Sequence, residues 1–128
     1  MCHGIPNDQP LKDGQIVNID VTAVVNGYHG DTSRMFLVGD VPLRARRLVD
    51  VTYEAMMRGI GTLKPGSLSG DLGHAIQAFA EAHGFSVVRD FCGHGVGLVF
   101  HDAPNILHYG QAGRGLAFRE GMFFTVEP

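Results

Sequence analysis

The chain has 128 residues, of which 45% are apolar and 18% charged, and its formal net charge is −3. This composition is typical of a globular domain, and the small negative charge excludes the basic surface of a nucleic-acid-binding protein. No run of about 18 apolar residues is present, which excludes a membrane-spanning helix. Cys2 and Cys92 form no CxxC pair and no disulfide framework, so we expect a reducing compartment, the cytoplasm.

Residues 16–38 predict a β-hairpin. Asn26-Gly27 lies between two apolar alternations, and both residue types tolerate the positive φ angles of a two-residue type I′ turn. This turn places Thr22 opposite Asp31, and Asp20 opposite Ser33. Because side chains alternate along a strand, the other face of the first strand is apolar and can pack on a core. That face carries Val17, Ile19, Val21, Ala23 and Val25.

Asp20 and Asp31 share one face of this hairpin as diagonal neighbours. Such neighbours lie roughly 7–8 Å apart, within joint reach of one site. Two close carboxylates need partners, because like charges either raise one pKa or bind a cation. The alternative is a solvated face on which the two carboxylates never meet.

Two helices are predicted after the hairpin. Apolar residues recur at spacings of three and four over residues 43–62, which indicates one amphipathic helix. A second helix is predicted to begin with Ser69 as its N-cap and to end before Gly84. His74 and His83 lie on this helix, and we expect both to be surface or capping residues.

Glycine dominates the segment that follows. Residues 86–91 predict a strand, and Gly93, Gly95 and Gly97 then alternate around His94. Such a glycine-rich run is not expected to form a well-packed strand. We therefore expect another part of the chain to approach its backbone closely, with His94 presented from it.

The last part of the chain predicts a loop and a hairpin. Residues 100–104 predict the loop, and residues 116–120 and 122–126 predict paired strands about Gly121. Helices that alternate with antiparallel hairpins indicate the α+β class. We find no linker and expect one domain over residues 1–128.

Six polar residues lie on apolar elements or in glycine-rich loops: His3, Asp20, Asp31, His94, His101 and Glu127. Carboxylates with an imidazole suit divalent Mn, Fe, Co or Zn. Carboxylates that bridge two such ions form a hydrolytic site, and nearby histidines can orient a peptide group. No serine or cysteine has the context of a covalent nucleophile. The residues favour a metal site, and their spacing does not name a substrate.

Six motifs carry a family resemblance: CHGIP at 2–6, NIDVT at 18–22, HGDTS at 29–33, CGHGVG at 92–97, FHDAP at 100–104 and TVEP at 125–128. They span nearly the whole chain, which resembles the type I methionine aminopeptidases of peptidase family M24. The HGDTS motif in particular resembles these enzymes more than their prolidase and aminopeptidase P relatives. The resemblance implies a partial pita-bread (creatinase/aminopeptidase) fold, α+β, with an antiparallel sheet and two helices. It makes residues 1–128 a partial metallopeptidase catalytic domain.

The same resemblance implies two divalent metal ions, Co, Mn, Fe or Zn. By position, Asp31 matches the carboxylate that bridges the ions, Asp20 a ligand of one ion, and His94 a ligand of the other. Glu127 matches a further ligand of the His94 ion that also serves the nucleophilic water. His29 shares the predicted face of Asp31, but the family does not use this position, and we predict that it is no ligand.

The resemblance also assigns the substrate side. His101 matches the histidine that contacts the scissile carbonyl, His3 the histidine near the new amine, and Phe100 a wall of the methionine pocket. The implied catalytic residues are therefore His3, His101 and Glu127. The implied activity is hydrolytic removal of the initiator methionine from nascent proteins that begin with Met and a small residue. The ribosome is a further partner that this activity allows, and we expect a monomer without nucleic-acid or membrane specificity.

Two parts of the family pattern have no match. A second glutamate ligand, on a strand after TVEP, is matched by none of Glu54, Glu81 and Glu120. The family also has an N-terminal segment before CHGIP that builds part of the methionine pocket. We therefore expect a fragment truncated at both ends, inactive by itself, that binds at most one ion tightly.

Two other functions remain open. One is a metallopeptidase like prolidase or aminopeptidase P, which would favour proline in the second position of the substrate. The other is a pita-bread binding module that has lost its metals. Such modules lose ligands first, whereas this chain keeps Asp20, Asp31, His94 and Glu127.

Overall fold

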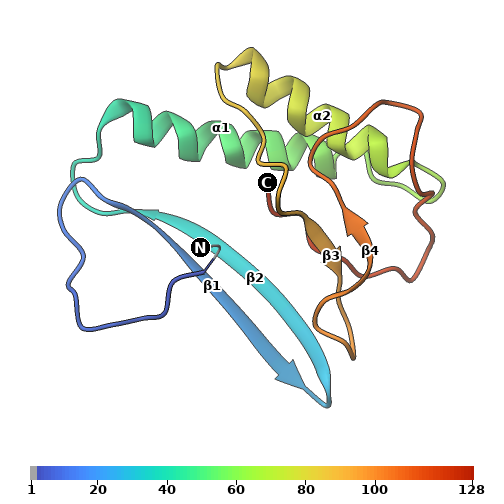
Figure 1. Cartoon of the computed structure of the whole chain (residues 1–128), viewed down its shortest axis with the longest axis horizontal. Helices are drawn as coiled ribbons and strands as arrows, with labels where there is room; N and C mark the ends of the chain where they lie inside the picture. The colour runs from blue at the N-terminus through green and yellow to red at the C-terminus, as the bar shows by residue number, and fades with distance from the viewer. Residues whose placement is uncertain (1–2) are drawn as a thin grey trace.

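The computed structural model describes residues 3–128, so Cys2 and the prediction of its redox state lie outside the described residues. Two helices lie side by side on one side of the molecule, and two separate two-stranded antiparallel sheets lie on the other (Figure 1). The elements in chain order are β1 (Ile16–Val25), β2 (Tyr28–Leu37), α1 (Leu43–Ile60), α2 (Ser69–Ala82), β3 (Gly93–Gly95) and β4 (Asp102–Ile106). This arrangement confirms the α+β class. Within residues 3–128, no helix has the length and apolarity needed to cross a membrane.

The β1–β2 hairpin forms as predicted. Asn26 and Gly27 have φ angles of 52° and 83°, which is the left-handed pair that a type I′ turn requires. Thr22 pairs with Asp31, and Asp20 with Ser33. The local chemistry of one dipeptide therefore sets the register of two ten-residue strands.

The apolar face of the hairpin is not part of the core, contrary to the prediction. Ile19, Val21 and Val25 are 50%, 53% and 68% exposed. The core instead joins the helices, β4 and the C-terminal segment through Ala55, Leu72, Ile76, Ile106 and Phe118. The alternation of residues determines which side chains share a face, whereas what covers that face depends on the rest of the fold.

Both predicted helices are present, with small differences at their ends. Helix α1 ends at Ile60, two residues before the predicted end at residue 62. In α2, Ser69 is the first helical residue and not the N-cap: its hydroxyl accepts the Leu116 N–H at 3.0 Å. Gly84, with a φ of 80°, follows the end of α2 as predicted.

The two histidines of the second helix behave as expected. His83 is the C-cap of α2, and its Nδ1 lies 2.8 Å from the Phe79 carbonyl oxygen. His74 is exposed on the helix surface. His83 therefore caps the helix and His74 lies on its surface, and neither belongs to the group of potential metal ligands described below.

The predicted strand at 86–91 is absent, because no other described segment pairs with it. Gly93–Gly95 forms a short buried strand instead, which corrects the prediction that this run is not a strand. The expected close approach is confirmed: a Cβ on Gly93 would collide with the Thr125 carbonyl, and one on Gly95 with the Ala103 carbonyl. The missing side chains let neighbouring backbone pack directly on both sides of His94.

The last part of the chain also differs from the prediction. β4 begins at Asp102, inside the predicted loop at 100–104, and pairs with β3. Residues 116–120 and 122–126 form no hairpin, although Gly121 does lie in a turn, with a φ of 83°. The two segments pair elsewhere, through single bridges from Ala117 to Leu68 and from Phe124 to Gly95. Partners far away in sequence take the place of the local pairing.

Candidate metal centre

Three potential metal ligands converge from three parts of the fold. Asp31 comes from β2, His94 from β3 and Glu127 from the C-terminal segment, and one donor atom from each lies within 4.8 Å of the others. The Nε2 atom of His94 is 3.3 Å from Asp31 Oδ2 and 3.6 Å from Glu127 Oε1. Chain segments far apart in the sequence thus contribute to one site.

The backbone fixes the orientation of the His94 ring. Its Nδ1 lies 2.9 Å from the Gly95 carbonyl oxygen. Because a carbonyl only accepts hydrogen bonds, Nδ1 is the donor in this contact, and Nε2 is directed toward the two carboxylates. One imidazole nitrogen and two carboxylates then face one another. The donor set therefore fits a divalent ion.

Glu127 is held by two residues without a predicted role. Its carboxylate Oε1 accepts a hydrogen bond of 2.5 Å from the Thr125 hydroxyl, and its backbone N–H donates to His108 Nε2 at 3.0 Å. The Thr125 hydroxyl in turn accepts the His94 N–H at 3.0 Å. Sequence reasoning assigned a role to neither residue. The only signals were the position of Thr125 within TVEP and of His108 next to the apolar Ile106-Leu107 pair.

Burial lowers the pKa of His108 from 6.5 to about 4. The ring is therefore neutral at pH 7, and a neutral ring leaves Nε2 free to accept the N–H of Glu127. The hydrogen bond and the low pKa support the same protonation state.

Asp20 lies apart from the three converging ligands. Its carboxylate is 3.6 Å from Nδ1 of His3, and both side chains are accessible to solvent. It shares the face of Asp31, as the register requires, but the described group of three does not include it. The structure therefore pairs two predicted site residues, Asp20 and His3, beside the cluster.

Two of the three residues predicted to contact substrate, Phe100 and His101, lie next to His94, whereas the third, His3, lies against Asp20. The His101 and Phe100 rings lie 4.5 Å and 5.7 Å from the His94 ring, measured between centroids. His29 stacks on Phe100 at 5.5 Å, and its Nδ1 lies 2.9 Å from the Gly97 carbonyl oxygen. The group of three potential ligands does not include His29, and its exclusion as a ligand stays a prediction.

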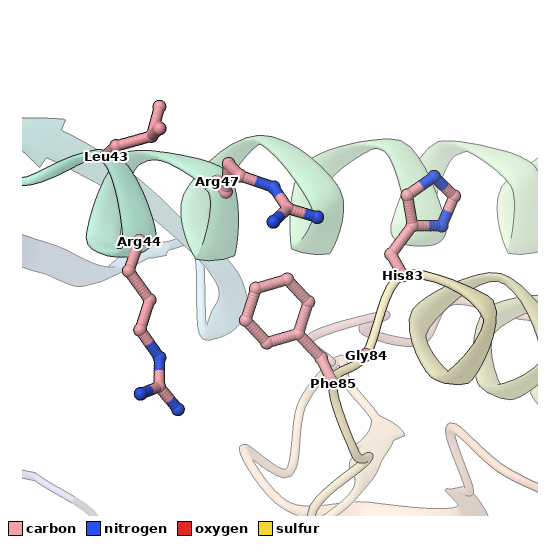
Figure 2. Close-up of a pocket in the computed structure, with 6 residues that line it drawn as sticks. All are labelled: Leu43, Arg44, Arg47, His83, Gly84 and Phe85. Atoms are coloured by element: carbon pink, nitrogen blue, oxygen red, sulfur yellow. The ribbon is translucent and has the colours of Figure 1, made fainter.

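A shallow hollow lies elsewhere, between the start of α1 and the end of α2 (Figure 2). It is lined by Leu43, Arg44, Arg47, His83, Gly84 and Phe85. In Figure 2 the Phe85 ring lies below α1, with the Arg44 side chain to its left and the Arg47 side chain above it. No carboxylate and no predicted site residue lines this hollow, so the His94 cluster is the candidate for metal chemistry.

Comparisons with known proteins identify the family of the chain. A model of metallopeptidase family M24 matches residues 1–128. Methionine aminopeptidase from Rickettsia prowazekii is 62% identical over 128 residues, which are 100% of this chain and 49% of that protein. The crystal structure of methionine aminopeptidase from the same organism superposes with a TM-score of 0.94, covering 98% of this chain and 50% of that one.

A second kind of enzyme is more distantly similar. The prolidase from Pyrococcus horikoshii OT3 superposes with a TM-score of 0.85 at 28% identity, covering 100% of this chain and 36% of that one. The chain spans about half the length of the curated relatives it matches.

Proposed function

The chain belongs to metallopeptidase family M24 and has part of the pita-bread fold, and we propose that it contributes the Asp31–His94–Glu127 cluster to a methionine aminopeptidase. Membership in the family implies divalent metal ions. The observation that carries the proposal is the convergence of Asp31, His94 and Glu127 within 4.8 Å. The reaction is hydrolysis of the peptide bond after an initiator methionine in a nascent protein.

We propose two ions from the set Mn, Fe, Co and Zn. Asp31, His94 and Glu127 would hold one of them, and Asp31 and Asp20 would contribute ligands to the other. Asp20 supports this assignment because it lies diagonal to Asp31 on the same face of the hairpin. When bound, the ions supply Lewis-acid activation of water and of the peptide carbonyl.

The protein side chains then divide the remaining work. Glu127 accepts a proton from the attacking water, because its second oxygen remains available while Oε1 accepts the Thr125 hydroxyl. His101, whose ring contacts those of His94 and Phe100, donates a hydrogen bond to the scissile carbonyl. His3 binds the new amine, and Phe100 forms an apolar wall for the methionine side chain.

The substrate class follows from this division. N-termini that begin with methionine and a small second residue fit an apolar wall beside the metal cluster. Newly made chains in the cytoplasm carry such N-termini, and the ribosome is where they emerge. A monomer suffices for this proposal, because all the proposed side chains come from one chain.

A chimaera provides the test. These 128 residues replace the matching 128 residues of the R. prowazekii enzyme, and the product is assayed with Mn²⁺ on Met-Ala, Met-Leu and Ala-Pro peptides. We expect rapid release of methionine from Met-Ala, slower release from Met-Leu, and no cleavage before proline. The matched control is the same chimaera with Asp31→Asn.

The two other functions predict different outcomes. Cleavage of Ala-Pro in preference to Met-Ala would overturn our proposal in favour of prolidase activity, which the 28% identical prolidase structure represents. No cleavage of any peptide, with no metal bound, would overturn it in favour of a binding module. The 62% identity to a methionine aminopeptidase supports the release of methionine from Met-Ala that we expect.

A further inference from the structure

Glu127 lacks the support that regular structure gives to the other two ligands. Asp31 belongs to β2 and His94 to β3, whereas Glu127 lies outside the strands and helices of residues 3–128. Its side chain is 43% exposed. A free glutamate has several accessible rotamers, so one conformation toward His94 needs a specific contact.

The Thr125 hydroxyl provides that contact. A hydroxyl has one proton, and here it is donated to Glu127 Oε1 at 2.5 Å. The oxygen lone pairs are then directed to the His94 N–H, which is 3.0 Å away. One oxygen atom therefore links the backbone of one ligand residue to the carboxylate of another.

The backbone fixes the position of Thr125 itself. Its N–H donates to the His94 carbonyl at 2.8 Å. Gly93 allows this approach, because a Cβ at that position would collide with the Thr125 carbonyl and lie 3.1 Å from its hydroxyl. Thr125 is thus bonded to His94 twice and cannot move independently of it.

We propose that Thr125 is a positioning residue that orders Glu127 for metal binding before the ion arrives. This inference rests on the proposed function, because it requires Glu127 to be a ligand. Thr125 does not contact the metal or the substrate; it acts through Glu127. Groups that orient metal ligands typically change metal affinity by about 10–100-fold when they are removed.

The test is calorimetric titration of Mn²⁺ into the metal-free 128-residue chain under reducing conditions. Thr125→Val keeps the shape and removes the hydroxyl, and we expect a dissociation constant about 10–100-fold higher. Thr125→Ser restores the hydroxyl and is expected to bind Mn²⁺ within about threefold of the wild-type chain. If the valine variant fails to fold, Thr125→Ala replaces it.

Thr62→Val is the matched control. The Thr62 hydroxyl donates to the Gly59 carbonyl at 2.7 Å, at the end of α1 and in no contact with the cluster. Its loss should leave the dissociation constant for Mn²⁺ unchanged. A partly unfolded population raises the apparent dissociation constant by the reciprocal of the folded fraction. Urea denaturation of each metal-free variant therefore gives the folded fraction, and the dissociation constants are compared after correction for it.

A second variant tests whether Thr125 acts through Glu127. In a Glu127→Ala background, Thr125→Val should weaken binding by less than about twofold, because the oxygen that accepts the Thr125 hydroxyl is already removed. Equal affinity of the wild-type and Thr125→Val chains, or a full effect in the Glu127→Ala background, would overturn the inference. If the wild-type chain itself binds no Mn²⁺, both the inference and the proposed function fail. If the wild-type chain binds Mn²⁺ and Thr125→Val binds it equally well, only the inference fails.

Discussion

The β1–β2 hairpin and the glycine-rich region around β3 reach the same site in opposite ways. The hairpin is regular and largely exposed, and its own turn residues determine its register. Around β3, regular structure is short, and neighbouring backbone packs against Gly93 and Gly95. Asp31 comes from the first region, and His94 and Glu127 are organised by the second. A locally determined element can thus supply a ligand, while long-range contacts set the site.

The largest expected effect is a difference in Mn²⁺ affinity between variants of the two hairpin carboxylates, Asp31 and Asp20. Asp31→Asn should weaken the tightest Mn²⁺ site by more than about 100-fold, because a direct ligand outweighs a residue that only orients one. Asp20→Asn, one diagonal step away on the same face, should weaken that site far less. Calorimetric titration measures both. Equal losses would place Asp20 among the ligands of the tight site.

A glycine substitution tests how strictly the second region is packed. Gly93→Ala should lower the free energy of unfolding by about 3 kcal/mol, because the new methyl group meets the Thr125 carbonyl. Gly97→Ala is the control, since a methyl group added there would meet no atom within 4 Å beyond its chain neighbours. Urea denaturation compares the two variants. A Gly93→Ala chain as stable as Gly97→Ala would show that close packing is not required there.

Acid should destabilise the second region through His108. Its folded pKa of about 4 lies below the ordinary value of 6.5, so the unfolded state binds more protons as the pH falls. The stabilisation is complete above pH 6.5 and is lost as the pH falls toward 4. Between pH 7 and pH 5 this loss is about 2 kcal/mol.

Urea denaturation of the metal-free chain at several pH values measures this loss. A His108→Gln variant is the control, and its unfolding free energy should fall less over the same pH range. An equally steep fall in that variant would assign the acid sensitivity to other groups.

The smallest effect is expected on the exposed face of the hairpin. Ile19→Thr should change the free energy of unfolding by less than about 0.5 kcal/mol, because Ile19 is half exposed. Ile76→Val, in the core between the helices, should lower it by about 1 kcal/mol. Thermal or urea denaturation compares the pair. A larger loss at Ile19 would show that another surface covers this face in solution.

Sequence reasoning succeeded where neighbouring residues determine the structure. Asn26-Gly27 fixed the hairpin register, and the apolar spacing located both helices. It failed where partners are distant: residues 86–91 pair with no other segment of the part that the structure describes, and the predicted C-terminal hairpin pairs with Leu68 and Gly95 instead. No pattern in a single sequence encodes which distant segment will lie alongside.

The same limit applies to the candidate site. Asp31, His94 and Glu127 were selected because polar residues on apolar elements are unusual, and the structure brings them together. Thr125 and His108 were missed, because a hydroxyl or a buried ring acquires its role only from the atoms beside it. For Asp20, the position on the same face of the hairpin as Asp31 was predicted correctly. Its side chain nevertheless lies against His3 and not in the group of three ligands.

A hydrogen bond of 2.8 Å from the His29 N–H to the Gly97 carbonyl joins the hairpin to the segment after β3. This contact is a pivot for the hairpin close to Asp31. Asp31 lies two residues from this pivot, and Leu37 lies eight residues away. At a rise of about 3.3 Å per residue, those arms are roughly 7 Å and 26 Å long. A rotation of the hairpin about the pivot therefore displaces Leu37 about four times as far as Asp31. Any such rotation would therefore displace the ligand least, because it lies close to this contact.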